Sequence, residues 1–161
     1  MKRRHIGVLG PHEVSEEEYR LGEEVGRRIA EAGATLLCGG LDGMMRAAAE
    51  GAKRAGGTTV GLLPGADRSA ANEFIDLAIP TGLGAFRNAL LVRSCDAVIA
   101  VRGAYGTLSE IAFALRLGVP VVGLDTWELR RDGRVDSGIR VARDPAEAVE
   151  TALRLACLNR V

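Results

Sequence analysis

Residues 97–110 read AVIAVRGAYGTLSE, an apolar run that passes through a glycine-containing turn into a helical pattern. Apolar runs without polar alternation, such as Ala97–Val101, are typical of strands that are covered on both faces. Gly103 and Gly106 allow a tight turn directly after the run. The stretch therefore predicts a buried strand, a turn and a helix, which is the repeating unit of an α/β protein.

The same pattern recurs along the chain and sets the expected fold. Five further strand-like runs lie at His5–Leu9, Thr35–Cys38, Thr58–Leu63, Ile75–Ile79 and Val119–Leu124. Helical patterns between such runs imply right-handed parallel crossovers. We therefore expect residues 1–161 to form a single α/β domain, a doubly wound, Rossmann-like parallel sheet of six or seven strands with helices on both faces. The expected strand order is 3-2-1-4-5-6, which places the fourth run beside the first.

Capping and stop signals set the limits of the expected helices. Ser15 and Glu18 have the spacing of a capping box, and Gly33 ends the helix that follows them. Further helices are expected at Asp42–Ala55, Ala85–Ser94, Thr107–Leu117 and Asp144–Leu158. Asp132-Gly133 predicts a hairpin turn before the last helix.

Composition excludes several classes of protein. Lys plus Arg and Asp plus Glu number 21 each, so no net field would attract nucleic acid or an anionic membrane. The three cysteines, Cys38, Cys95 and Cys157, have no paired spacing and are expected to be reduced thiols. The chain has two histidines, which argues against a metal centre, and it shows no apolar signal segment. We expect a cytoplasmic protein without a bound metal.

Glycine-rich loops follow four of the predicted strands. In a doubly wound sheet, ligands bind beyond the carboxyl ends of the strands, at the point where the strand order reverses. Glycine lets backbone N–H groups approach phosphate oxygens, and the next helix N-terminus adds a favourable partial charge. Each loop alone is explained equally well as a turn that needs glycine, but four loops on one edge favour a phosphorylated, nucleotide-like ligand. The expected binding residues are Gly10, Gly39, Gly40, Gly43, Gly82, Gly84, Gly103, Ala104, Tyr105, Gly106 and Thr107.

Two motifs resemble those of a known family. Arg87-Asn88 followed by the stretch Arg102–Glu110 is similar to the PGGxGTxxE signature of the LOG (Lonely Guy) family, which also carries the label lysine decarboxylase. The likeness is greater to the branch of that superfamily with the molybdenum-cofactor carrier proteins, through Gly39–Met44, Leu63-Pro64-Gly65 and Pro80–Gly84. The resemblance covers nearly the whole chain. It implies a Rossmann-like fold and a homo-oligomer, either a dimer or a tetramer, because this superfamily assembles through its helices.

The resemblance implies two functions from different classes. LOG enzymes are phosphoribohydrolases that cleave the N-glycosidic bond of a nucleoside monophosphate, which would make Arg87 and Glu110 catalytic. The signature here departs from PGG to Arg102-Gly103-Ala104, and Asn88 replaces the usual lysine, so we favour a binding protein. Its expected ligand is a nucleotide, a phosphate or a molybdopterin-type molecule, with no cofactor required. An oligomer with a vestigial pocket is a third alternative.

Lysine decarboxylation requires a Schiff-base lysine. The only lysines are Lys2, in the amino-terminal tail, and Lys53, within an alanine-rich helix. This argues against the activity in the family label.

Three charged residues have structural alternatives. Glu110 would stabilise an oxocarbenium-like transition state in an enzyme, but Thr107-Leu108-Ser109-Glu110 is also a capping-box pattern. Arg87 would grip a phosphate or a ribose through two hydrogen bonds, or it is a surface arginine. Arg102 is either a second anion contact or the partner of Asp96 or Glu110 in an ion pair. The sequence leaves each of these pairs open.

Overall fold

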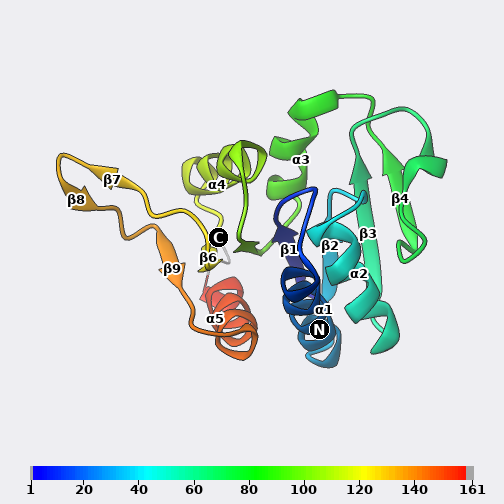
Figure 1. The fold of residues 1–161 in the computed structure, drawn as a ribbon, viewed down its shortest axis with the longest axis horizontal. Helices are drawn as coiled ribbons and strands as arrows, with labels where there is room; N and C mark the ends of the chain where they lie inside the picture. The colour runs from blue at the N-terminus through cyan, green and yellow to red at the C-terminus, as the bar shows by residue number, and fades with distance from the viewer. Residues whose placement is uncertain (1, 159–161) are drawn as a thin grey trace.

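The computed structural model describes residues 2–158 and has the α/β architecture that the sequence predicts (Figure 1). The strands of the large sheet are β1 (His5–Leu9), β2 (Thr35–Cys38), β3 (Thr58–Leu63), β4 (Leu77–Pro80), β5 (Ala97–Val101), β6 (Val121–Leu124) and β9 (Ile139–Val141). The helices are α1 (Glu16–Glu31), α2 (Met44–Arg54), α3 (Arg87–Arg93), α4 (Tyr105–Leu117) and α5 (Pro145–Leu158), with short 3-10 turns at Arg68–Ala70 and Gly84–Phe86.

The strand order confirms the doubly wound topology. The seven parallel strands lie in the order β4-β3-β2-β1-β5-β6-β9. When β4 is left out and the other six strands are numbered again along the chain, their order in the sheet is the predicted 3-2-1-4-5-6. One placement differs: the fourth run pairs with β3 at the sheet edge, Val60 opposite Leu77, and not with β1. The neighbour of β1 is β5, with Ile6 opposite Ala97.

Helices cover both faces of the sheet, as predicted (Figure 1). On one face, α1, α2 and α5 bury an apolar cluster that includes Ile29 and Met44. On the other face, α3 and α4 bury a second cluster that includes Leu91 and Ile111. The interior strand β5 contributes alternate side chains to the two clusters, because successive strand residues point to opposite faces. Its fully apolar sequence follows from this double burial.

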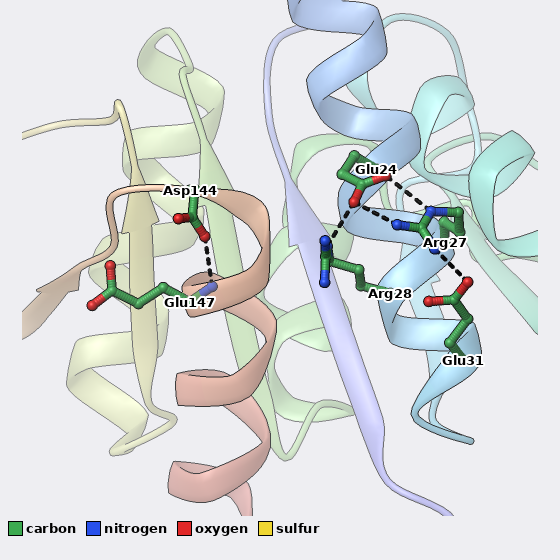
Figure 2. A network of polar contacts seen from close by, with 6 residues as sticks. All are labelled: Glu24, Arg27, Arg28, Glu31, Asp144 and Glu147. Carbon is green, nitrogen blue, oxygen red and sulfur yellow. Dashed lines mark hydrogen bonds and ion pairs between the residues drawn. The ribbon is translucent and has the colours of Figure 1, made fainter.

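Local signals account for most of the helix limits. Ser15 and Glu18 form the predicted capping box at the start of α1. Figure 2 shows the predicted start of α5, where Asp144 accepts a hydrogen bond of 2.8 Å from the N–H of Glu147. It also shows Glu24 of α1 bonded to two arginines, each at 2.6 Å. The α2 helix begins at Met44 and not at Asp42, because Gly43 serves as its N-cap.

The β6–α5 segment contains a strand that the sequence pattern did not reveal. The predicted turn at Asp132-Gly133 joins β7 (Arg130–Arg131) to β8 (Arg134–Val135) in an antiparallel hairpin that extends from the body of the protein (Figure 1). The chain then returns as β9 and pairs with β6. Because β9 has three residues and two of them are exposed, it lacks the continuous apolar run by which the other strands were recognised.

No helix among residues 2–158 combines the length and the apolar character needed to cross a membrane.

Candidate functional site

The reversal of strand order lies between β1 and β5. The chain leaves β1 for α1 on one face and leaves β5 for α4 on the other face. All pairings in the large sheet are parallel, so the loops after these strands lie at the same edge. This is the position where doubly wound sheets bind ligands.

A cavity of about 230 Å³ opens at this reversal, and we call it the Arg87 cavity. The β1–α1 loop, the end of β2 and the first turns of α3 and α4 form its walls. Predicted residues that line it are Gly10, Gly39, Arg87, Ala104, Gly106, Thr107 and Glu110, and they are joined by His12, Met45 and Asn88. The structure therefore brings both predicted catalytic residues together with the start of α4.

The start of α4 presents uncapped backbone N–H groups. The helix begins at Tyr105, and its N-cap Ala104 makes no side-chain hydrogen bond. The first N–H groups of a helix have no partner within the helix and carry a partial positive charge. Gly103 allows this geometry, because its φ is 118° and an added Cβ would lie 2.5 Å from the Cβ of Thr107. The predicted glycine-containing loop is therefore followed by a helix start whose first N–H groups have no side-chain cap.

Glu110 is not a capping residue, so that alternative was wrong. Thr107 already lies within α4 and cannot act as its N-cap. Glu110 lines the cavity instead, and among the described residues it accepts no hydrogen bond. Burial raises the pKa of Glu110 to about 7, although the positive charge of Arg87 acts to lower it. Near neutral pH, this carboxyl group is therefore divided between its neutral and ionised forms.

Arg87 is a half-buried cation, and two of its three guanidinium nitrogens donate hydrogen bonds to the protein. Its Nη1 donates to the carbonyl oxygens of Gly39, at 2.7 Å, and Leu62. Its Nε donates to Asn88 Oδ1 at 2.9 Å, and Asn88 Nδ2 reaches Ser109 Oγ on α4 at 3.3 Å. Within residues 2–158, Nη2 donates to no protein acceptor, and Arg87 is one of the residues that line the cavity. Burial lowers the pKa of Arg87.

Two of the predicted binding glycines shape the neighbouring loop and do not line the cavity. An added Cβ on Gly43 would lie 2.3 Å from the carbonyl oxygen of His12. The first N–H of α2, on Met44, donates to Pro11 O at 3.0 Å. Gly40 is buried, and its carbonyl accepts the Asn72 N–H at 2.9 Å. The start of α2 is therefore packed against the protein.

Gly82 and Gly84 lie at the same sheet edge but outside the cavity. They follow β4, which the structure places beyond β3. Both are exposed, and their N–H groups donate to Gly65 O and Pro64 O, each at 2.9 Å. Their distance from the reversal follows from the edge position of β4.

A second, wider cavity of about 610 Å³ adjoins the first, and we call it the Trp127 cavity. Pro11 and Ala104 line both cavities. Its other lining residues are Glu13, Glu18, Arg102, Gly103, Asp125, Thr126, Trp127 and Glu128. Of these, Gly103 is a predicted binding residue and Arg102 a predicted alternative anion contact, whereas the loop after β6 has no glycine signature and carried no prediction. Tyr105, a predicted binding residue, is 81% exposed and lies at 5.9 Å from Trp127, measured between ring centroids.

Arg102 forms neither of the predicted ion pairs. Its guanidinium lies 3.6 Å from Glu18 and 3.8 Å from Asp125. Asp96 instead accepts the His5 N–H at 2.8 Å. Arg102 Nε is buried without a hydrogen bond. Arg102 therefore belongs to the wall of the Trp127 cavity.

Comparisons with known proteins show the family of this chain. Residues 3–149 match the model of the SLOG cluster4 family. An uncharacterized protein from Archaeoglobus fulgidus is 46% identical over 149 residues, which covers 92% of this chain and 94% of that protein.

Two solved structures extend the comparison. The molybdenum cofactor binding protein from Rippkaea orientalis is 33% identical with a TM-score of 0.86, over 96% of this chain and 98% of that chain. The molybdenum cofactor carrier protein from Chlamydomonas reinhardtii is 34% identical with a TM-score of 0.84, over 97% of this chain and 99% of that chain.

Proposed function

The chain belongs to the SLOG cluster4 family, and from this premise we propose that it is a carrier for a phosphorylated ligand of the molybdenum-cofactor type. The ligand's phosphate would lie in the Arg87 cavity, against the first turn of α4. The observation that carries this proposal is the uncapped start of that helix, which lines the same cavity as Arg87. The molybdenum cofactor ligands named for two similar structures support the same class of ligand.

The groups of the cavity have distinct roles in this proposal. The N–H groups of Tyr105, Gly106 and Thr107 would donate to phosphate oxygens, as helix N-termini do in other phosphate sites. Arg87 would supply the positive charge through Nη2, while Nη1 holds the ends of β2 and β3 in place. A phosphorylated nucleotide would be held in the same way, so the phosphate is the shared recognition element.

A second function is favoured by one specific observation. Glu110 has a pKa of about 7, which suits a general acid or base at neutral pH, and it lines the same cavity as Arg87. These two residues would act on the N-glycosidic bond of a nucleoside monophosphate. The carrier proposal remains preferred because the PGG element of the hydrolase signature is replaced by Arg102-Gly103-Ala104.

Binding and turnover measurements separate the two functions. We expect the protein to bind pyrophosphate, nucleoside monophosphates and molybdenum cofactor by calorimetry or gel filtration, without release of free base. Arg87→Ala should weaken phosphate binding by about 1.5–3 kcal/mol, the value of a charged hydrogen bond. The matched control is Arg20→Ala, which removes an exposed arginine of α1 that pairs with Glu16.

The Glu110→Gln variant then decides between carrier and hydrolase. Base release that falls about a hundredfold or more in this variant, with binding retained, would establish the hydrolase. If no phosphate-bearing compound binds to the wild-type protein, the carrier proposal is wrong.

A further inference from the structure

The two adjoining cavities have opposite electrostatic character. The Arg87 cavity combines an arginine and a helix N-terminus with a single carboxyl group, that of Glu110, whose pKa is raised to about 7 by burial. Four carboxylates and one arginine line the Trp127 cavity: Glu13, Glu18, Asp125, Glu128 and Arg102. A phosphate is therefore attracted to the first cavity and repelled by the second. A ligand that spans both cavities needs an anionic end and an end that donates hydrogen bonds.

The chemistry of the Trp127 cavity favours a flat organic ring over a metal ion. No group of His, Cys, Asp or Glu side chains among residues 2–158 has the arrangement of a metal site. Trp127 lines the cavity, and its position is fixed because the side chain packs against the apolar cluster beside α4. Its Nε1 also donates to Ala104 O at 3.3 Å. A fixed indole offers a flat surface on which an aromatic ring can stack.

Within residues 2–158, Glu13 and Asp125 are the two carboxylates of this cavity that form no hydrogen bond, and Asp125 is the one that shares the loop after β6 with Trp127. Glu18 is occupied by the capping box, and Glu128 bonds to Arg130 at 2.8 Å. Asp125 forms only the 3.8 Å ion pair with Arg102. Its side chain is 64% exposed, and it stands two residues before Trp127. A carboxylate accepts two parallel hydrogen bonds from adjacent N–H groups on one edge of a ring.

We infer that the Trp127 cavity is the ring subsite of the ligand whose phosphate lies at α4, and that it selects a guanine-like edge. Such an edge places a ring N–H beside an exocyclic amino group, as in guanine and in a pterin. In this arrangement Trp127 stacks on the ring and Asp125 accepts both donors. The inference rests on the proposed phosphate site and identifies the chemical class of the rest of the ligand.

The first test compares ligands that differ only in the ring. Guanosine, inosine and adenosine monophosphate carry the same phosphate, but only guanosine has the ring N–H beside an amino group. We expect the wild-type protein to bind guanosine monophosphate about ten- to a hundredfold more tightly than inosine monophosphate, the value of one charged hydrogen bond. Neopterin monophosphate distinguishes the two sources of the edge, because tighter binding than guanosine monophosphate indicates a pterin.

Two variants locate the preference in the cavity. Asp125 has a φ of 51°, a conformation that asparagine tolerates, so Asp125→Asn should fold normally. This variant should lose the preference for guanosine over inosine monophosphate and keep its affinity for inorganic phosphate. The control Glu31→Gln removes a half-exposed carboxylate at the far end of α1 and should keep the preference.

Intrinsic fluorescence gives an independent test on the unmodified protein. Trp127 is the only tryptophan of the chain. Guanosine monophosphate should quench its emission by stacking, whereas inorganic phosphate should leave the emission unchanged.

The outcomes distinguish this inference from the proposed function. Equal affinity for the three nucleotides, or a guanine preference that survives in Asp125→Asn, would overturn the ring subsite and leave the phosphate site standing. Failure of inorganic phosphate, the nucleotides and neopterin monophosphate to bind would refute the proposed function and this inference with it.

Discussion

Replacing Glu110 by glutamine should make the protein more stable at neutral and alkaline pH. Burial raises the pKa of this carboxyl from the ordinary value of 4.5 to about 7. At about 1.4 kcal/mol for each pH unit, ionisation of Glu110 in the folded protein costs up to about 3 kcal/mol. Glutamine has nearly the same shape and carries no charge, so Glu110→Gln removes this cost.

The pH dependence of this effect has a definite sign. The unfolded chain releases the Glu110 proton near pH 4.5, whereas the folded protein keeps it until about pH 7. The wild-type free energy of unfolding therefore falls across this interval and levels off above it. The difference between Glu110→Gln and wild type should be near zero below pH 4.5 and reach about 3 kcal/mol by about pH 8.

Urea unfolding of both proteins across this pH range measures the difference directly, since other titrating groups contribute equally to the two curves. Glu31→Gln, at a half-exposed position, should show a flat difference. A flat difference for Glu110→Gln, or a less stable variant at alkaline pH, would show that attraction to Arg87 outweighs the cost of burial.

Three further predictions concern the loop before α4, the hydrogen bonds that Arg87 donates to the protein, and the oligomeric state. Gly103→Ala should lower the free energy of unfolding by about 1–3 kcal/mol and abolish phosphate binding, because φ is 118° and the new Cβ meets Thr107. Gly106→Ala, with no atom within 4 Å of the added Cβ, should fold normally and weaken phosphate binding only; thermal unfolding and calorimetry check both variants. Arg87→Lys should destabilise the protein in urea, because one ammonium group cannot replace the bonds to Gly39, Leu62 and Asn88. Light scattering should give a mass of a dimer or tetramer of the 17.0 kDa chain, and a monomer at micromolar concentration would contradict this.

The sequence predicts a strand well where burial of that strand on both faces determines which residues it can contain. Strands β1, β2, β3 and β5 have the predicted limits. The reason is clearest for β5, where burial on both faces demands an unbroken apolar run. The position of β4 could not be read in this way. Its residues are exposed or half-buried, as expected at an edge, and no local signal says which strand an edge strand will join. Because β4 lies at the edge of the sheet, Gly82 and Gly84, which follow it, lie outside the cavity.

Within the candidate site, the sequence predicted the loop in which a glycine with positive φ is required. Gly103 lies, as predicted, in the loop before a helix, but that helix begins at Tyr105 and not at the predicted Thr107. The capping-box pattern at Thr107 and Glu110 was misleading, because the helix begins two residues before Thr107. Trp127 and Asp125 carry no motif. They reach the site through the return of the chain after β6, which depends on tertiary structure.

Glu110 remains the residue that the fold alone does not explain. It caps no helix, accepts no hydrogen bond from residues 2–158, and destabilises the folded protein when it ionises. Groups with strongly perturbed pKa values in a cavity are typical of functional sites, where such a cost is tolerated. A hydrolase would use its proton transfer at the glycosidic bond, whereas a carrier would use the neutral form to donate a hydrogen bond to a bound phosphate. Because ionised Glu110 repels phosphate, a carrier would hold its ligand more tightly below pH 7 than above it.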